Sequence, residues 1–210
     1  LGLIHPEGVY DDPKGQPLRK EIYPRLRYHF QFVNVLKLFA EILHWNIYGI
    51  QVYAGKKRAV DFISMSNIFH PSTINGSFIH DGSGLCGGLK FQDVNKGFSW
   101  NTKPHKSRII QITKNELITL ANTFEGTDQW EDTKIVSIHT KEIIKVLEKL
   151  GKFPNSIKNF ENKISECWHE TNDFNDGYIK RETKFPDVKK FELIFSGPHF
   201  YISNPLYKTP

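Results

Sequence analysis

The pattern of apolar and polar positions in the first 55 residues predicts a strand, a helix and then two strands. The apolar run 1–4 is typical of a short buried strand. Leu18, Ile22 and Leu26 recur at helical spacing, and Pro24 is expected to weaken or kink that helix because proline lacks an amide donor. A short connection joins two further strand-like runs, which favours an antiparallel pair. These runs are 30–36 and 47–53.

Beyond residue 55 the pattern predicts an alternation of strands and helices around a long irregular stretch. The stretch 67–102 is rich in glycine and shows no clear periodicity. Strands are predicted on either side of it, and two amphipathic helices follow. We expect an α+β fold, with one mixed sheet and several covering helices. The predicted strands are 59–65, 108–113, 167–169, 178–185, 191–195 and 199–202, and the predicted helices are 114–124, 140–150 and 154–163.

Composition places the chain among ordinary globular proteins. Of its 210 residues, 39% are hydrophobic and 24% are charged, and 16 Phe with 8 Tyr supply bulky side chains for a core. Two cysteines do not make a disulfide framework, so we expect a reducing, cytoplasmic environment. No stretch approaches the roughly 20 apolar residues of a membrane helix, and we expect no membrane partner.

Charge adds a candidate surface for a polyanion. The net charge is +5, and the segment 94–115 contains no Asp or Glu. Basic side chains without local carboxylates can lie against phosphates and release counterions, and an aromatic ring among them can touch a base or sugar. A solvated loop is the plainer interpretation of the same pattern. The candidate DNA-binding residues are Lys56, Lys57, Arg58, Trp100, Lys103, His105, Lys106 and Arg108.

Two other motifs point to chemistry less strongly. Gly82–Gly87 matches G-x-G-x-x-G, but a dinucleotide site needs a following helix and an acid about 20 residues on, and the sequence predicts neither. We therefore expect a surface loop. His70, His80 and His105 lack the spacing of zinc ligands, so no metal site is predicted. A metal nuclease would need one of two upstream acids beside an E-x-K triplet; these residues are Asp173, Asp176, Glu182 and Lys184.

The order of several segments resembles one protein family. The opening LGLIHPEGVYDDPKG is similar to a strand and loop late in the catalytic domain of large bacterial adenine methyltransferases of the type IIG-like restriction–modification and phage-defence kind. The run 18–39 resembles the helix and strand that follow, and 46–53 resembles the last strand of that domain. Further resemblances run in order along the chain, at 66–74, 80–84, 168–172, 181–183 and 196–210.

This resemblance implies a parent enzyme that transfers a methyl group from S-adenosylmethionine to adenine in duplex DNA. The cofactor loop and the Asn-Pro-Pro-Tyr motif of such an enzyme would precede Leu1, so we expect this chain to be a middle or C-terminal piece that is inactive alone. Asn204–Tyr207 has leucine where the motif has its second proline, and we interpret it as a turn at a strand end. No catalytic, cofactor-binding or metal-binding residue is assigned here.

The same resemblance implies an organisation in three parts. Residues 1–55 would form the tail of the catalytic domain, resembling the last strand, helix and hairpin of a Rossmann-like methyltransferase sheet. Residues 56–190 would connect to, or belong to, the target-recognition region, and 191–210 would begin a following unit. The expected partners are duplex DNA and the rest of the methyltransferase chain.

Three functions remain open at this point. The chain could contribute DNA binding and target recognition, or it could be a non-catalytic spacer or docking module with little DNA affinity. The third alternative is a segment of a metal-dependent nuclease. The first two differ in one observable respect, which is whether the basic residues converge on one face of the fold.

Overall fold

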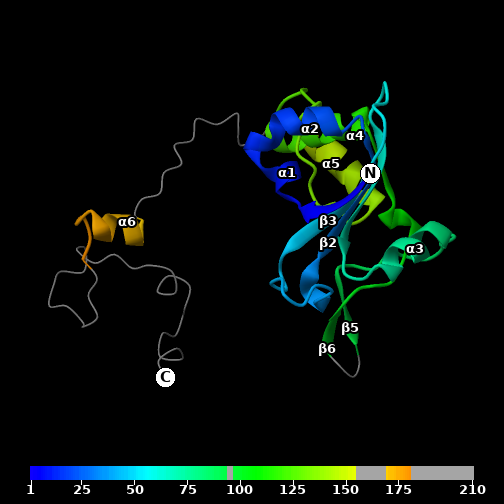
Figure 1. The fold of residues 1–210 in the computed structure, drawn as a ribbon, viewed down its shortest axis with the longest axis horizontal. Coiled ribbons are helices and arrows are strands. Elements are labelled where there is room, and N and C mark those ends of the chain that lie inside the picture. The colour runs from blue at the N-terminus through cyan, green and yellow to red at the C-terminus, as the bar shows by residue number, and fades with distance from the viewer. Residues whose placement is uncertain (94–96, 155–168, 181–210) are drawn as a thin grey trace. The chain divides into compact units, whose positions relative to one another are not determined.

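The structure is a computed structural model that describes residues 1–93, 97–154 and 169–180 (Figure 1). The chain divides into two units, 1–160 and 161–210, each of which is considered by itself. The first unit contains a mixed five-stranded sheet with several helices, which confirms the predicted α+β class. The sheet continues past residue 55, because two of its strands come from later in the chain.

The elements follow one another through the first unit as strands, helices and short turns. The strands are β1 (Gly2–Pro6), β2 (Leu26–Val33), β3 (Ile47–Tyr53), β4 (Asp61–Ile68), β5 (Lys90–Asp93), β6 (Gly97–Trp100) and β7 (Ile110–Thr113). The helices are α1 (Gly8–Asp11), α2 (Gln16–Ile22), α3 (Ser72–Ile79), α4 (Lys114–Leu120) and α5 (Lys141–Gly151). Shorter helical turns are η1 (Pro13–Gly15), η2 (Asn34–Leu36), η3 (Lys106–Arg108) and the π-type η4 (Ala121–Glu125).

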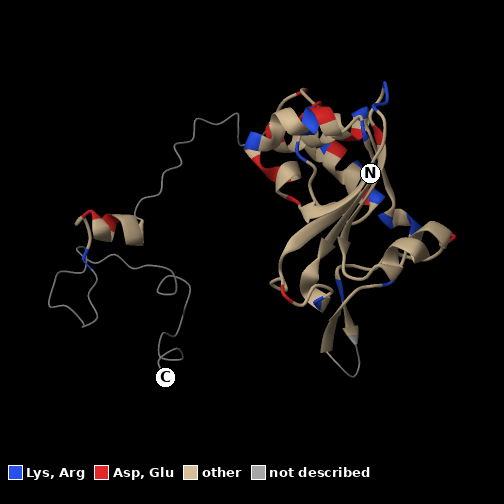
Figure 2. Cartoon of the chain, viewed as in Figure 1, with Lys and Arg blue, Asp and Glu red and all other residues tan. Residues whose placement is uncertain are grey.

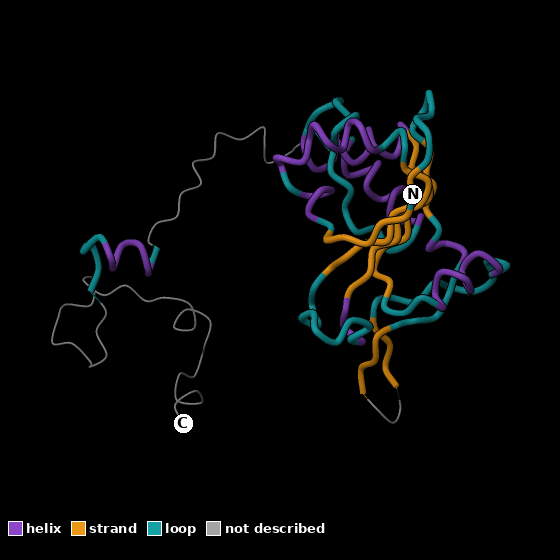
Figure 3. Tube along the Cα trace, in the orientation of Figure 1, coloured by secondary structure: helices purple, strands orange, loops and turns teal. Residues whose placement is uncertain are grey.

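The main sheet has the strand order β1-β3-β2-β4-β7, and Figure 3 draws its strands in orange. Strand β3 runs antiparallel to both of its neighbours, β1 and β2, which are therefore parallel to each other. Strand β4 is parallel to β2, and β7 closes the other edge antiparallel to β4. The antiparallel pairing of β2 with β3 confirms the prediction. Because β1, β2 and β4 run in the same direction, their carboxyl termini lie at the same end of the sheet.

Each face of the sheet packs a separate apolar cluster. On one face, Phe62, Ile110 and Ile112 pack with residues of α4 and α5, and Tyr10 of α1 and Tyr23 after α2 join them. Figure 1 shows these helices gathered on the same side of the sheet. The opposite face holds a smaller cluster, to which α3 contributes one partly buried residue; its members are Phe32, Tyr48, Met65, Ile68, Phe30, Ile50, Ile74 and Ile109.

A buried polar network around Glu7 fastens the start of α1 to the sheet. The Glu7 carboxylate accepts hydrogen bonds from Gln51 Nε2 at 2.9 Å and Gln31 Nε2 at 3.3 Å, and it lies 2.8 Å from His29 Nε2. The other ring nitrogen of His29 lies 3.0 Å from Ser64 Oγ. A carboxylate this deeply buried is tolerated because each of its oxygens has polar partners.

Helix boundaries follow local sequence signals. Helix α2 ends at Ile22, two residues before Pro24, as the missing proline donor requires. Helix α4 begins with a capping box, in which Thr113 and Glu116 satisfy backbone N–H groups reciprocally. Helix α5 begins differently, because the side chain of Thr140, the residue before the helix, accepts no bond from the helix backbone.

The prediction of an irregular stretch over 67–102 is wrong in part, since α3, β5 and β6 lie within it. Helix α3 lacked an apolar period because it buries the small polar residues Thr73 and Ser77. Helix α6 (Glu170–Asn175), which precedes a turn at Gly177, lies where no helix was predicted. The helix over 154–163 and the strands 191–195 and 199–202 lie wholly or largely outside the described residues, as does most of 178–185.

Candidate nucleic-acid interface

The β5–β6 hairpin follows the chain segment that leaves the carboxyl end of β4. Its register pairs Lys90 with Trp100 and Gln92 with Phe98. Directly paired residues share a face, and alternate residues along a strand point the same way. One face of the hairpin therefore presents Lys90, Gln92, Phe98 and Trp100 together, while Phe91 belongs to the opposite face.

Aromatic rings from three parts of the chain meet at Trp100. The ring of Trp45, from the loop between β2 and β3, stands edge-on to Trp100, with centroids 5.6 Å apart and an interplanar angle of 79°. Phe69, which follows β4, lies 4.9 Å from the same indole. Trp100 is half-buried by these neighbours, whereas Trp45 remains 58% exposed and Phe98 75% exposed.

Two lysines of this region lie over aromatic rings. Lys90 Nζ is 4.3 Å from the centre of the Trp100 ring, and Lys103 Nζ is 5.3 Å from the centre of the Phe91 ring. A lysine ammonium over a ring face is held in place by the ring quadrupole while it stays accessible to an anion. We call the whole set the hairpin surface; Trp45, Lys90, Phe98 and Trp100 lie on one face of the hairpin, and Phe91 with Lys103 on the other.

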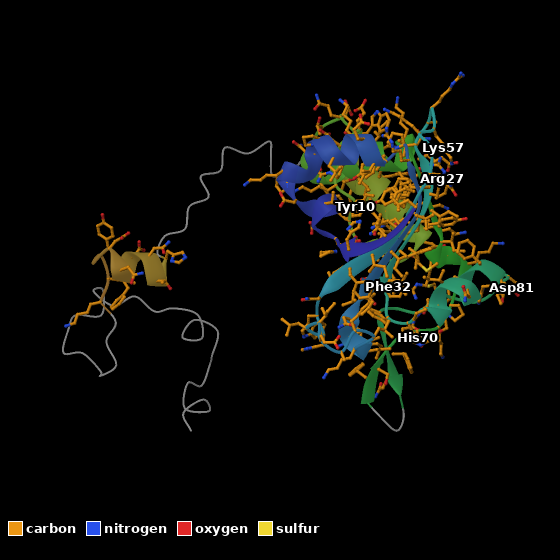
Figure 4. The ribbon with its side chains drawn as sticks, viewed as in Figure 1. Tyr10, Arg27, Phe32, Lys57, His70 and Asp81 are labelled. Atoms are coloured by element: carbon orange, nitrogen blue, oxygen red, sulfur yellow. The ribbon has the colours of Figure 1, made fainter. Side chains whose placement is uncertain are left out.

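The predicted basic residues do not converge on one face. Of the eight candidates, Trp100 and Lys103 lie on the hairpin surface. Lys56, Lys57 and Arg58 lie in the β3–β4 loop, at the amino end of β4 and so at the other end of the sheet. Figure 4 shows Lys57 at that end and His70 toward the hairpin, and Figure 2 shows a separate group of basic residues on the β3–β4 loop.

The β3–β4 loop also has partners for its charges. Lys56 Nζ lies 3.5 Å from a carboxylate oxygen of Glu21, and Lys57 Nζ lies 3.4 Å from one of Asp61. Both are surface pairs, which contribute little to stability but lower the local positive potential. The loop is therefore a weaker site for phosphate than its sequence suggested.

Two further candidates lie in the interior. Arg108 is fully buried, and its Nη2 donates to the backbone carbonyls of Ser66 at 3.0 Å and Asn67 at 2.8 Å. His105 is 7% exposed and caps η3, where its Nδ1 accepts from the Ser107 amide. Both residues organise the ends of β4 and α3 and do not face a ligand. Lys106 is exposed, beside the Gly82 backbone.

Burial also decides what the Ser64–His29–Glu7 chain can do. A hydroxyl, an imidazole and a carboxylate in hydrogen-bond contact are the parts of a nucleophilic triad. Here Ser64 is 3% exposed, His29 0% and Glu7 7%, so a substrate has no path to the hydroxyl. The network is a structural tie between β2, β4 and α1.

Several site residues were missed from the sequence. Trp45 and Lys90 carried no motif, and β5 and β6 were read as part of an irregular stretch. A usable signal was the aromatic and polar alternation on either side of Gly97, whose φ of 73° suits glycine in a hairpin turn.

The glycine-rich motif forms a loop, as predicted. Gly82 and Gly84 have φ values of 91° and 78°, and strand β5 follows instead of the helix that a dinucleotide cradle needs. Cys86 lies half-buried in this loop, and burial raises the pKa of its thiol above the ordinary range. The segment therefore does not fit a nucleotide cofactor.

The metal-nuclease alternative gains no geometric support within the described ranges. No group of three His, Cys, Asp or Glu side chains there could hold a metal ion. Asp173 and Asp176 lie in and just after α6, while Glu182 and Lys184 are outside the described residues. In the part of the chain that the structure describes, every helix is too short or too polar to cross a bilayer.

Comparisons with protein-family models, with curated proteins and with solved structures gave no match for this chain.

Proposed function

We propose that this chain is part of a bacterial DNA adenine methyltransferase and contributes DNA contacts through the hairpin surface. The observation that carries the proposal is the meeting of Trp45, Lys90 and Trp100 beyond the end of the sheet where β2 and β4 finish, with Lys103 on the other face of the same hairpin. In open α/β sheets, ligands bind outside the carboxyl ends of the parallel strands. Lysines with interleaved aromatic rings suit a nucleic acid, which offers phosphates and ring faces together.

The order of elements supports the methyltransferase part of the proposal. Strand β1, helix α2 and the β2–β3 pair follow the strand–helix–hairpin order that the resemblance implies for the tail of a Rossmann-like sheet. The methyl donor, S-adenosylmethionine, would bind elsewhere in the parent enzyme, and this chain would position DNA.

Fluorescence anisotropy of a labelled random-sequence duplex over a salt series tests the DNA contacts. We expect binding by the 210-residue chain to weaken steeply as salt rises. The double variant Lys90→Ala/Lys103→Ala should lower the slope of log K against log salt by about two. The matched control, Lys56→Ala/Lys57→Ala, removes the same charge from the other end of the sheet and should change the slope less. Failure of the wild-type chain to bind at low salt would refute the proposal.

One observation favours docking as a second function. Among the described strands, β1 pairs with β3 alone and forms an edge of the sheet, and it exposes Leu3 and Ile4 by 43% and 60%. An edge with exposed apolar side chains is suited to pairing with another strand. In the proposed parent, the rest of the catalytic sheet would pair here. Ile4→Lys should then abolish reassembly of a methyltransferase split before Leu1, as measured by co-purification, without unfolding this chain.

A further inference from the structure

The loop between β2 and β3 exposes more apolar surface than phosphate contacts would use. Leu43 is 75% exposed and Trp45 58% exposed, next to the lysines of the hairpin. A surface that only followed a sugar–phosphate backbone would need the cations and no exposed indole. Large exposed apolar groups in such a setting mark a binding site.

The loop holds Trp45 in a fixed position. Buried Asn34 donates through its side-chain nitrogen to the carbonyls of Phe39 at 2.8 Å and Ile42 at 3.0 Å, and its Oδ1 accepts from the Phe39 amide. The Asn34 amide also donates to the carbonyl of Asn46 at 3.0 Å, which closes the loop beside Trp45. An aromatic ring ordered before binding loses little entropy when a ligand stacks on it.

The two indoles have different surroundings. The Trp100 ring has Phe69 at 4.9 Å and the Lys90 ammonium 4.3 Å from its centre, so neighbouring side chains already take up the space that a stacking ligand would need. Trp100 meets Trp45 nearly at right angles, at 79°, and the His44 ring lies 5.1 Å from Trp45, yet Trp45 remains 58% exposed. Trp45 is therefore the platform of the pair, and Trp100 its support.

We propose that the exposed indole of Trp45 stacks on an unpaired base of DNA, while Lys90 contacts a phosphate that flanks it. This inference rests on the proposed function and narrows it, because it names single-stranded or locally opened DNA as the preferred ligand of the hairpin surface. Every base has a π-face, so an aromatic platform accepts an unpaired base without sequence preference. In an intact duplex the neighbouring pairs cover those faces.

A nucleic acid fits the hairpin surface better than an apolar peptide does. The segment 97–115, which includes β6, contributes no carboxylate. Lys90 lies over the ring of Trp100 in β6, and Lys103 lies over the ring of Phe91 in the paired strand β5. An unpaired nucleotide supplies a flat apolar ring and an anion one backbone unit away, and it would satisfy both features at once.

Three labelled DNA probes of equal length test the inference by anisotropy at one salt concentration: a plain duplex, the same duplex with one unpaired bulged base, and a single strand. Wild-type protein should bind the bulged and single-stranded probes more tightly than the plain duplex. Trp45→Leu keeps an apolar side chain but no ring, and should weaken those two probes by about tenfold or more while the plain duplex changes little. Trp45→Phe retains a ring and should recover most of the affinity.

Tryptophan fluorescence supplies a second readout. Stacking should quench emission of the wild-type protein when the single strand binds, and Trp45→Phe should lose most of that quenching. Equal affinity for the three probes, or an equal loss on all three in Trp45→Leu, would overturn the stacking inference and leave the proposed function standing. No binding to any probe at low salt would overturn both. A change of molar mass with Trp45→Leu, without a change in DNA affinity, would identify the surface as a protein contact and overturn the inference.

Discussion

At the scale of single residues, Gly49 is the described glycine at which an added Cβ would come closest to other atoms. A Cβ at this position would lie within 2.0 Å of Glu7 Oε1 and 1.9 Å of Gln51 Nε2, inside the buried network that ties α1 to the sheet. Glycine is therefore required at this position because the side chains of Glu7 and Gln51 occupy the space of a Cβ, and not because of the backbone conformation.

We predict that Gly49→Ala lowers the free energy of unfolding by about 1–3 kcal/mol, as other overpacking substitutions do. Gly55→Ala is the matched control, since a Cβ there meets no heavy atom within 4 Å. Urea denaturation followed by circular dichroism measures both. Equal stability of the two variants would mean that the Glu7 network is not formed as described.

Two buried tyrosines make a prediction about alkaline pH. Burial is the largest cause that raises the pKa of Tyr10 and of Tyr23 above the ordinary value of 10.0. In the unfolded chain these phenols ionise at about pH 10, whereas at that pH they stay protonated in the folded chain. Their contribution to stability is therefore complete below that pH and is lost as the pH rises above it.

We expect the urea midpoint to fall steadily above about pH 10. The ultraviolet absorbance of tyrosinate should rise as the chain unfolds, because the two buried phenols ionise only on unfolding. Ionisation of all tyrosines in one step, with no loss of stability, would contradict the described burial.

The sequence predicted single residues unevenly. Trp100 and Lys103 were chosen as candidates and lie on the hairpin surface. Arg108 and His105 were chosen on charge alone, and charge does not show that a side chain hydrogen-bonds to buried backbone. The partners of Trp100 come from distant parts of the chain, so no local pattern could indicate that Trp45 and Phe69 meet there.

At the scale of elements, α4 and α5 begin in different ways although each is preceded by threonine. Thr113 takes part in a complete capping box, while the Thr140 hydroxyl bonds to Glu142 and not to the helix backbone. Thr113→Ala should therefore cost about 1 kcal/mol of stability. Thr140→Ala should cost less. Thermal unfolding of the two variants compares them, and a larger loss in Thr140→Ala would show that the helix starts are misassigned.

Predictability of the elements follows their apolar patterns. Strands β1 and β3 were predicted because their apolar runs are bounded by turns, and α4 and α5 because one face of each is apolar. The prediction for β2 began at residue 30 and was wrong for Leu26, which was interpreted as a helix position but lies in that strand. Helix α3 was missed because its buried residues are small and polar, and the hairpin because only one of its faces packs against the fold. Both missed elements lie near the candidate interface.

At the scale of the whole molecule, basic side chains occupy opposite ends of the main sheet. The Lys56–Arg58 loop lies at the amino end of β4, where two of its lysines pair with carboxylates. The hairpin surface lies beyond the carboxyl ends of β2 and β4 and combines its lysines with exposed rings. The separation makes the two ends independently testable, since variants at one end leave the other intact.

Hydrogen exchange with and without DNA tests the central claim most directly, because it reports which backbone amides the ligand covers. The account predicts that a bound DNA probe slows exchange in 34–46 and in the described part of 88–105, and leaves 54–60 unchanged. Protection confined to the β3–β4 loop, or no protection under conditions where anisotropy reports binding, would contradict the assignment of the hairpin surface as the DNA contact.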